Sequence, residues 1–132
     1  MVALARVEVL QGLPSEERRG VIDAVHAALV EALEVPADDP TVRLVEHRPE
    51  NVRMPPDRSD RYTVVEVTMF AGRSIQTKRR LYEAIVRNLN ACGVPSDDVL
   101  VVLHEPGMEN WASTAEARRA MSTWASRSTS DL

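Results

Sequence analysis

Two side chains in this sequence are placed to bind or activate a small acid. Arg73 stands between Gly72 and Ser74, where a strand pattern gives way to a helix pattern. A guanidinium at such a turn binds a carboxylate through two parallel hydrogen bonds, and the adjoining helix N-terminus also attracts anions. Asp39 ends a Val-Pro-Ala-Asp-Asp run and can orient or deprotonate a water molecule. The alternatives are a solvated surface arginine and an ordinary turn residue beside Asp38.

Other side chains that could do chemistry have structural explanations of equal or greater weight. Trp111 can wall a substrate site, although a contact between subunits explains it better. His26 lies beside the apolar stripe of a helix pattern and is expected to pack, whereas His47 and His104 end strand patterns and can face a pocket. The histidines and acids lack metal-ligand spacing, so we expect no metal site. The single cysteine, Cys92, excludes an internal disulfide and indicates a reducing cytoplasm.

A weak internal repeat positions these residues. Val-Pro-Ala-Asp-Asp at residues 35–39 returns as Val-Pro-Ser-Asp-Asp at residues 94–98. Each copy follows a strand pattern and a long amphipathic pattern, and each precedes an alternating apolar stretch that ends in a histidine. Such recurrence indicates duplication of one β-α-β unit. A single domain of 132 residues is therefore expected to comprise unit one, a connecting loop, unit two and a C-terminal tail, at about residues 2–47, 48–61, 62–104 and 105–132.

Local signals define the ends of the expected elements. Strand patterns cover residues 3–10, 42–46, 63–70 and 99–103. Ser15 and Ser74 are suitable N-caps for the two helices, and Gly93 suits the position just after the second helix. The last strand is nearly all apolar, which predicts a strand buried on both faces.

These units predict an α/β (α+β) fold with a four-stranded, mostly parallel sheet. Each β-α-β crossover makes a parallel pair, and both helices cover one face of the sheet. The other face is too apolar to be left in water, so the chain is expected to self-associate. The net charge of −4 gives no general attraction to nucleic acid or anionic membranes. No apolar run approaches the ~18 residues that span a bilayer, and no signal peptide is evident, which favours the cytoplasm.

Four stretches of the chain occur in a characteristic order. They are residues 6–12 (RVEVLQG), residues 23–26 (DAVH) with 35–39 (VPADD), residues 72–74 (GRS) with 78–79 (KR), and residues 109–111 (ENW). Together, over roughly residues 2–117, they resemble the tautomerase superfamily, and most closely its malonate semialdehyde decarboxylase-like branch, in which two short units are fused. The resemblance implies a β-α-β fold, a homotrimer, a site at the N-terminus and chemistry without a cofactor.

The resemblance also implies roles for individual residues. In the superfamily an N-terminal proline, exposed by loss of methionine, acts as general base, general acid or electrophile on small oxo acids. An arginine from the turn before the second helix, here Arg73, binds the substrate carboxylate, and the acid that ends the Val-Pro-x-Asp-Asp motif, here Asp39, handles the attacking water. In this chain Val2 follows Met1, and the proline column falls at Ala3. If Met1 is removed, the primary α-amine of Val2 is the expected catalytic group.

Two departures from the superfamily pattern shape the expected function. Val2 stands in place of proline, and Ala71 stands in place of the first arginine of an Arg-Gly-Arg turn. We therefore expect weak or altered activity on a small oxo acid, either keto–enol tautomerisation or decarboxylase- or hydratase-type chemistry. One alternative is a non-catalytic trimeric relative that binds a small carboxylate or serves as a scaffold. Another is an enzyme that has moved its chemistry to other residues, such as Asp39 with water.

Overall fold

The computed structural model describes residues 3–38 and 41–112, which form one mixed sheet and two helices. The strands are β1 (Ala3–Leu10), β2 (Val42–His47), β3 (Thr63–Met69) and β4 (Val99–His104). The helices are α1 (Ser15–Leu33) and α2 (Ile75–Ala91), and the short 3-10 turns are η1 (Pro49–Asn51), η2 (Ser96–Asp98) and η3 (Met108–Asn110). Two of the candidate residues, Val2 and Asp39, lie outside the described residues, as does the chain after residue 112.

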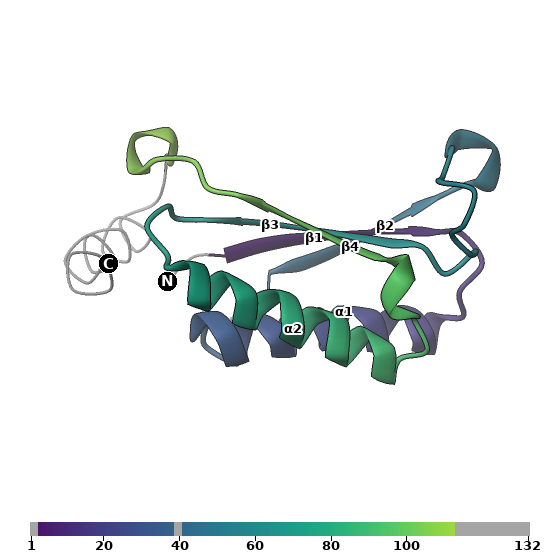
Figure 1. The fold of residues 1–132 in the computed structure, drawn as a ribbon, viewed down its shortest axis with the longest axis horizontal. Coiled ribbons are helices and arrows are strands. Elements are labelled where there is room, and N and C mark those ends of the chain that lie inside the picture. Colours follow the sequence, from purple (N-terminus) through teal and green to yellow (C-terminus); the bar gives the residue numbers. More distant parts are fainter. Residues whose placement is uncertain (1–2, 39–40, 113–132) are drawn as a thin grey trace.

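The sheet joins the two units side by side in the order β2-β1-β3-β4. β1 is parallel to β2 and β3 is parallel to β4, because a helix carries the chain back within each unit. The units meet at the centre, where β1 and β3 run antiparallel and Ala3 pairs with Met69. Both helices lie on the same side of the sheet (Figure 1). The expected α+β fold, with a mostly parallel four-stranded sheet and two helices on one face, is confirmed.

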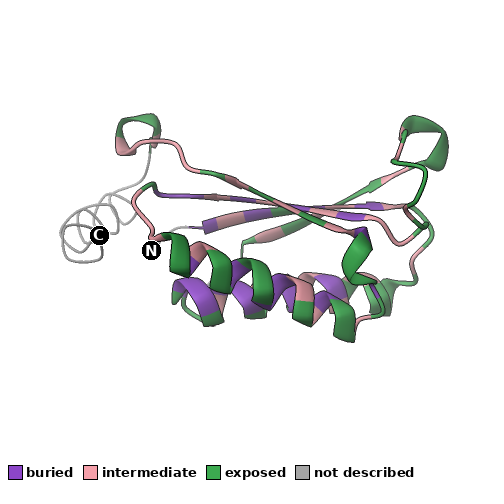
Figure 2. Ribbon diagram, in the orientation of Figure 1, coloured by how far each residue is buried: buried purple, intermediate pink, exposed green. Residues whose placement is uncertain are grey.

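The core lies between the helices and the sheet because side chains alternate along each strand. Val7 in β1 and Val65 in β3 are fully buried on the helix side, where they meet Leu29 of α1 and Ile85 of α2. Figure 2 shows the buried residues along this layer and the exposed ones on the outer surfaces. Full burial of such a side chain contributes about 1.5–3 kcal/mol, so this layer is the main source of stability. Within the described ranges, no helix is long and apolar enough to cross a membrane.

Two of the three expected helix-end residues act as predicted. The Ser74 hydroxyl accepts a hydrogen bond from the backbone N–H of Thr77 at 3.2 Å, which caps α2. Gly93 follows the end of α2 with a φ of +88°, a conformation that glycine adopts without strain. The prediction for Ser15 is wrong: it is the first residue of α1, and Pro14 holds the cap position with no side-chain cap. Proline suits this place because it has no N–H to satisfy and its φ is already fixed.

The prediction that β4 is buried on both faces is also wrong. Its residues alternate, and Leu100 and Val102 are 46% and 37% exposed. The physical reason is that β4 is an edge strand of a sheet with helices on one side only, so every second apolar residue points away from the core. We call the side of the sheet without helices the open face. Its apolar residues are the physical ground for expecting self-association.

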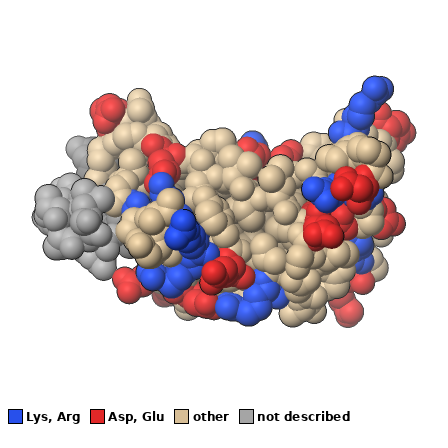
Figure 3. Space-filling model, viewed as in Figure 1, with Lys and Arg blue, Asp and Glu red and all other residues tan. Residues whose placement is uncertain are grey.

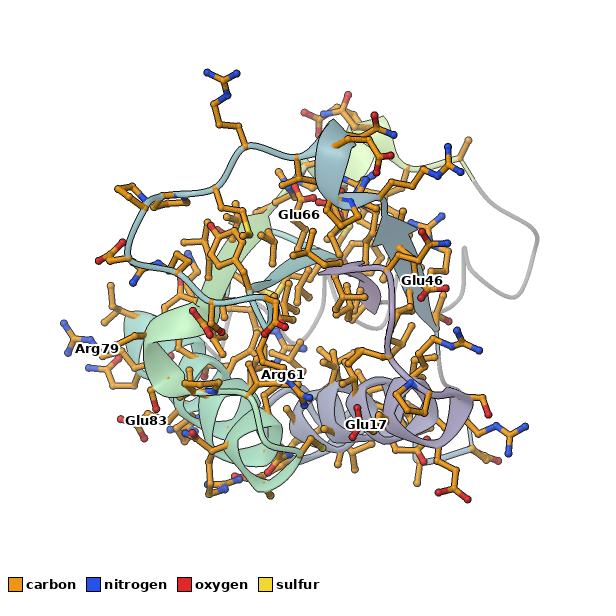
Figure 4. All side chains as sticks on the ribbon, turned by 90° about the vertical axis from the view of Figure 1, so that its right-hand side faces the viewer. Glu17, Glu46, Arg61, Glu66, Arg79 and Glu83 are labelled. Atoms are coloured by element: carbon orange, nitrogen blue, oxygen red, sulfur yellow. The ribbon has the colours of Figure 1, made fainter. Side chains whose placement is uncertain are left out.

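On the open face, each of the two units has a corresponding glutamate–histidine pair. His47, at the end of β2, places Nε2 2.9 Å from Glu8 Oε1, and His104, at the end of β4, places Nε2 2.8 Å from Glu66 Oε1. Glu66 also accepts a hydrogen bond from Arg6 Nη2 at 2.6 Å. The Arg6 bond, followed by that of His104, lowers the pKa of Glu66 to about 2. Figure 4 shows Glu66 on the side of the sheet opposite the helices.

The duplication continues beyond the strands, which the sequence patterns did not reveal. η1 and η3 each follow the second strand of a unit, and each contains Glu-Asn, at residues 50–51 and 109–110. The next residue, Val52 or Trp111, donates its backbone N–H to the first residue of the turn, at 3.3 and 3.2 Å. Both turns rise above the ends of the sheet on the side away from the helices (Figure 1). Val52 and Trp111 therefore hold equivalent positions at opposite ends of the molecule.

The loop between the units is fixed to unit two by a buried carboxylate. Asp98, 3% exposed, accepts hydrogen bonds from the Ser59 backbone N–H at 3.0 Å and from the Ser59 hydroxyl. The Ser59 bonds lower the pKa of Asp98. Arg61 adds a hydrogen bond from Nη2 to the Cys92 carbonyl at 3.1 Å and an ion pair with Glu17 at 3.5 Å. Figure 4 shows Arg61 and Glu17 near one another on the helix side.

Candidate functional site

The first candidate site lies at the end of the sheet where β1 begins and β3 ends. Ala3, the first described residue of β1, is 6% exposed and pairs with Met69, the last residue of β3. The chain then passes through Phe70 and the turn that carries Arg73 into α2. In Figure 1 the start of β1 lies at the same end of the sheet as this turn. The pairing of β1 with β3 therefore brings the start of β1 and the arginine-bearing turn to one edge.

The Arg73 side chain is held in place by a hydrogen bond and is not fully exposed to solvent. Its side chain is half-buried, and Nη2 donates a hydrogen bond to the Leu33 carbonyl at 3.3 Å. Leu33 is the last residue of α1, where carbonyls have no partner within the helix and carry partial negative charge. The guanidinium thus bridges the start of α2 and the end of α1. Arg73 is therefore an oriented side chain and not the solvated surface arginine that was the alternative.

Trp111 packs within its own chain at this end. Its ring meets that of Phe70 in a T-shaped arrangement, with centroids 4.8 Å apart and planes at 85°. Its indole N–H donates to the Pro106 carbonyl at 3.3 Å. Phe70 is 2% exposed and Trp111 is half-buried. The pair forms an apolar wall that connects the β3 end to η3, beside the turn that carries Arg73.

Lys78 belongs to this end as well. Its Nζ lies 2.7 Å from Glu105 Oε2, and the two side chains are only 25% and 23% exposed. Glu105 Oε1 is buried, and no hydrogen-bond partner for it occurs among the residues that the structure describes. The ion pair holds Lys78 of α2 against the segment that follows β4. Figure 3 shows basic side chains gathered near this end of the molecule.

The loop that leads to Asp39 is described only as far as Asp38, which is exposed. His26 is half-buried in α1, and its Nε2 lies 2.9 Å from the Ala37 carbonyl. Because a carbonyl only accepts, Nε2 carries the proton and Nδ1 is a buried acceptor. His26 therefore anchors the loop rather than forming a reactive centre, as the packing interpretation predicted.

The two histidines that end strands lie at different ends of the sheet, and His104, which pairs with Thr68, is at the end that carries Arg73. His104 is on the open face beside Glu66, and His47 is at the opposite end of the sheet. The structure thus brings together Arg73, Phe70, Trp111 and the start of β1, but not His47. Within residues 3–38 and 41–112, no group of three or more histidine, cysteine and acidic side chains could hold a metal ion. This end of the sheet thus combines an oriented guanidinium with an apolar wall.

Two family models, each described as Tautomerase enzyme, match the chain over residues 39–113 and residues 4–61. The first alone covers more than half of the 132 residues. The chain therefore belongs to the tautomerase family. Together the two matches cover residues 4–113.

Several proteins are similar to this chain over most of its length. It is 27% identical over 116 residues to Probable tautomerase YrdN of Bacillus subtilis (strain 168). The aligned region covers 83% of this chain and 88% of YrdN. The structure of FG41 malonate semialdehyde decarboxylase inhibited by 3-bromopropiolate is 32% identical, with a TM-score of 0.79 over 91% of this chain and 96% of that one. A fused 4-OT symmetric trimer, 23% identical with a TM-score of 0.75 over 85% and 92% of the chains, shares the fold. The tautomerase-superfamily resemblance is confirmed.

Proposed function

We propose that the protein is an enzyme that acts on a small 2- or 3-oxo acid at the end of the sheet that carries Arg73. The observation that carries the proposal is the pairing of Ala3 with Met69, which brings the start of β1 to the edge from which the Arg73 turn departs. The half-buried guanidinium, braced by the Leu33 carbonyl, is suited to bind a carboxylate. The Phe70–Trp111 wall excludes water from the carbon chain of the substrate.

The reacting group in this proposal is the α-amine of Val2 after loss of Met1. A free α-amine has a pKa of about 8. A nearby guanidinium disfavours the ammonium form and lowers that pKa, so the amine is a base at neutral pH. It accepts the proton of the enol hydroxyl and returns a proton to the neighbouring carbon. The enol form of the substrate thereby becomes the keto form, which is keto–enol tautomerisation. As a primary amine it also condenses with a carbonyl to an imine, which favours loss of CO₂ from a 3-oxo acid.

Asp39 has a supporting role in the proposal, which is to orient or deprotonate a water molecule for a hydratase- or decarboxylase-type step. Similarity to malonate semialdehyde decarboxylase supports this branch of the chemistry. The bond between His26 and the Ala37 carbonyl holds Ala37, two residues before Asp39, against α1. The activity is expected to be weak or altered relative to proline-bearing relatives, because Val2 lacks the secondary amine and Ala71 supplies no second guanidinium.

Assembly forms part of the proposal. Structures that share this fold include a fused 4-OT symmetric trimer, and the open face here carries apolar residues such as Leu100 and Val102. We propose a homotrimer in which copies of this face, or of its edges, meet in the cytoplasm. Sedimentation velocity tests this directly: a species of about three times 14.7 kDa supports it, and a monomer at micromolar concentration contradicts it.

The catalytic proposal is tested by following ketonisation of an enolised arylpyruvate by ultraviolet absorbance. Intact-protein mass spectrometry first establishes whether Met1 has been removed. Arg73→Gln is expected to reduce kcat/KM by at least about tenfold through loss of charge-assisted hydrogen bonds. Arg79→Gln, at an exposed position of α2, is the matched control and is expected to leave kcat/KM unchanged. Equal turnover in both variants would remove Arg73 from the mechanism.

A second candidate function is a non-catalytic trimer that binds a small carboxylate or serves as a scaffold. The observation that favours it is the residue after Met1, which is valine instead of the proline on which the superfamily's chemistry usually rests. Val2→Pro, with loss of Met1 confirmed by mass spectrometry, separates the two. Gain of turnover shows that the rest of the site is competent and only the amine differs, whereas no turnover in either protein supports the scaffold.

A further inference from the structure

A hollow lies at the end of the sheet opposite Arg73. It has a volume of about 310 Å³, which falls in the range of small-molecule pockets. Its floor is on the open face, from Leu10 at the end of β1 and Val64 at the start of β3. Its sides are His47, Val52 and Tyr62, so it lies beneath η1. Figure 4 views the molecule from this end.

The duplication explains why the hollow exists. Val52 follows η1 as Trp111 follows η3, and the two turns share the same backbone bonds. At the Arg73 end the indole of Trp111, which directly follows η3, packs on the ring of Phe70. At the opposite end valine replaces the indole, and the equivalent space is left open. A ligand with a small planar ring therefore suits the shape of the hollow.

The polar groups of the hollow are suited to an anion. Arg53 and Asn51 line it together with Tyr62, and within the described part of the chain no ion pair or hydrogen bond engages the Arg53 guanidinium or the Tyr62 hydroxyl. The one acid in the lining, Glu8, already pairs with His47 at 2.9 Å. A free guanidinium, a phenol and an amide beside an apolar floor form a donor set for a carboxylate.

We propose that this hollow is a second ligand site, distinct from the Arg73 site, that binds a small aromatic carboxylate. The ring occupies the space that Trp111 fills at the other end, between Leu10, Val52 and Val64. The carboxylate meets Arg53, with Tyr62 donating a further hydrogen bond. Nothing in this inference depends on the proposed oxo-acid activity, because it uses neither the Val2 amine nor the Arg73 turn.

The test uses phenylacetate and the full-length protein, with the imidazole proton signals of its three histidines as reporters in ¹H NMR. The His47 signal, assigned with His47→Gln, is expected to shift saturably with a Kd on the order of 1 mM, which suits a ligand of this size. Phenylacetamide, which lacks the charge, is expected to bind at least about tenfold more weakly. No movement of the His47 signal with phenylacetate would overturn the proposal, whether the hollow is unsuitable or is closed by a second copy. Tighter binding of 2-phenylethylamine would also overturn it, because Glu8 would then be the anchor.

Variants locate the binding within the hollow. Arg53→Gln is expected to raise the Kd by at least about tenfold. Arg48→Gln, an exposed arginine from the same loop that does not line the hollow, is the matched control and is expected to change the Kd less than about twofold. Val52→Trp restores the ring found at the other end and is expected to abolish the His47 shift. Equal affinity in all three variants would place the ligand elsewhere and overturn the proposal.

The outcome is separable from that of the oxo-acid proposal. Arg73→Gln is expected to keep the phenylacetate-induced shift of His47. A protein without turnover that still shows this shift refutes the proposed activity alone, and an active protein without the shift refutes the second site alone.

Discussion

Substituting Glu66 by glutamine removes one charge from the centre of the open face while keeping the shape of the side chain. In the native protein the carboxylate accepts from Arg6 at 2.6 Å and from His104 at 2.8 Å. A fall in the pKa of Glu66 from 4.5 to about 2 corresponds to about 3 kcal/mol of stabilisation. Because the Arg6 side chain is 48% exposed, water screens the interaction, and we expect Glu66→Gln to cost about 1–2 kcal/mol at pH 7.

The pH dependence of this cost gives the prediction its specificity. Since folding lowers the pKa of Glu66, its contribution is fully present above the unfolded value of 4.5 and is lost as the pH falls toward about 2. Urea unfolding is followed by circular dichroism at pH 7, 5, 4 and 3, with one fixed protein concentration because self-association also affects stability. The difference between wild type and Glu66→Gln is expected to be constant from pH 7 to 5 and to shrink between pH 4 and 3.

A carboxylate in a weaker ion pair provides the control. Glu46 Oε1 lies 3.4 Å from Arg18 Nη1, and both side chains are about a third exposed. Glu46→Gln is therefore expected to cost less than about 0.5 kcal/mol at every pH. A pH-independent loss in Glu66→Gln, or a loss no larger than that of Glu46→Gln, would refute the argument that the Arg6–Glu66–His104 cluster holds its charge in the folded state.

Four further substitutions test the packing and the connections of the fold, each measured by urea unfolding at pH 7. Asp98→Asn weakens the charge-assisted hydrogen bonds that buried Asp98 accepts from Ser59 and is expected to cost about 1–3 kcal/mol. The difference from wild type is expected to shrink below about pH 4, where Asp98 protonates in the unfolded chain. Leu29→Ala opens a cavity in the layer between helices and sheet and is expected to cost about 2–5 kcal/mol. Trp111→Ala loses its packing on the neighbouring ring and is expected to cost about 1–3 kcal/mol, together with loss of the Trp111 contribution to tryptophan fluorescence. Gly93→Ala places a side chain at a φ of +88° and is expected to cost about 1–2 kcal/mol; no cost for it would show that the backbone relaxes there.

The fold was predictable because its strongest signals are local and occur twice. The repeated Val-Pro-x-Asp-Asp run, the strand alternation and the Ser74 cap each depend on residues close in the chain, and each predicted the element that is found. The burial of β4 was not predictable in the same way. An apolar strand such as residues 99–103 has the same composition whether helices cover its second face or a further copy of the chain does. Only the topology shows that helices cover one face.

The candidate site was less accessible to sequence reasoning because its contacts are long-range. Lys78 belongs to a run of three basic residues, which is typical of a solvated face, and its partner Glu105 is 27 positions away. Only the packing of α2 against β4 brings them together. Arg73 lies at the strand-to-helix turn that the sequence predicts, but the carbonyl that braces it belongs to the other unit. The hollow beneath η1 required a comparison of Val52 with Trp111, which is meaningful only after the two turns are seen in equivalent places.

The antiparallel seam between β1 and β3 makes the chain a covalent version of a two-part assembly. Each half contributes a strand–helix–strand piece. Neither piece can bury the apolar face of its own helix fully without the other, because the two pieces share one core. The peptide bonds of the connecting segment mainly raise the local concentration of one half around the other, an effect of millimolar order for short flexible linkers. Cleavage at the exposed dipeptide Pro55-Pro56 is therefore expected to leave two fragments that remain together and can be exchanged for separately expressed halves.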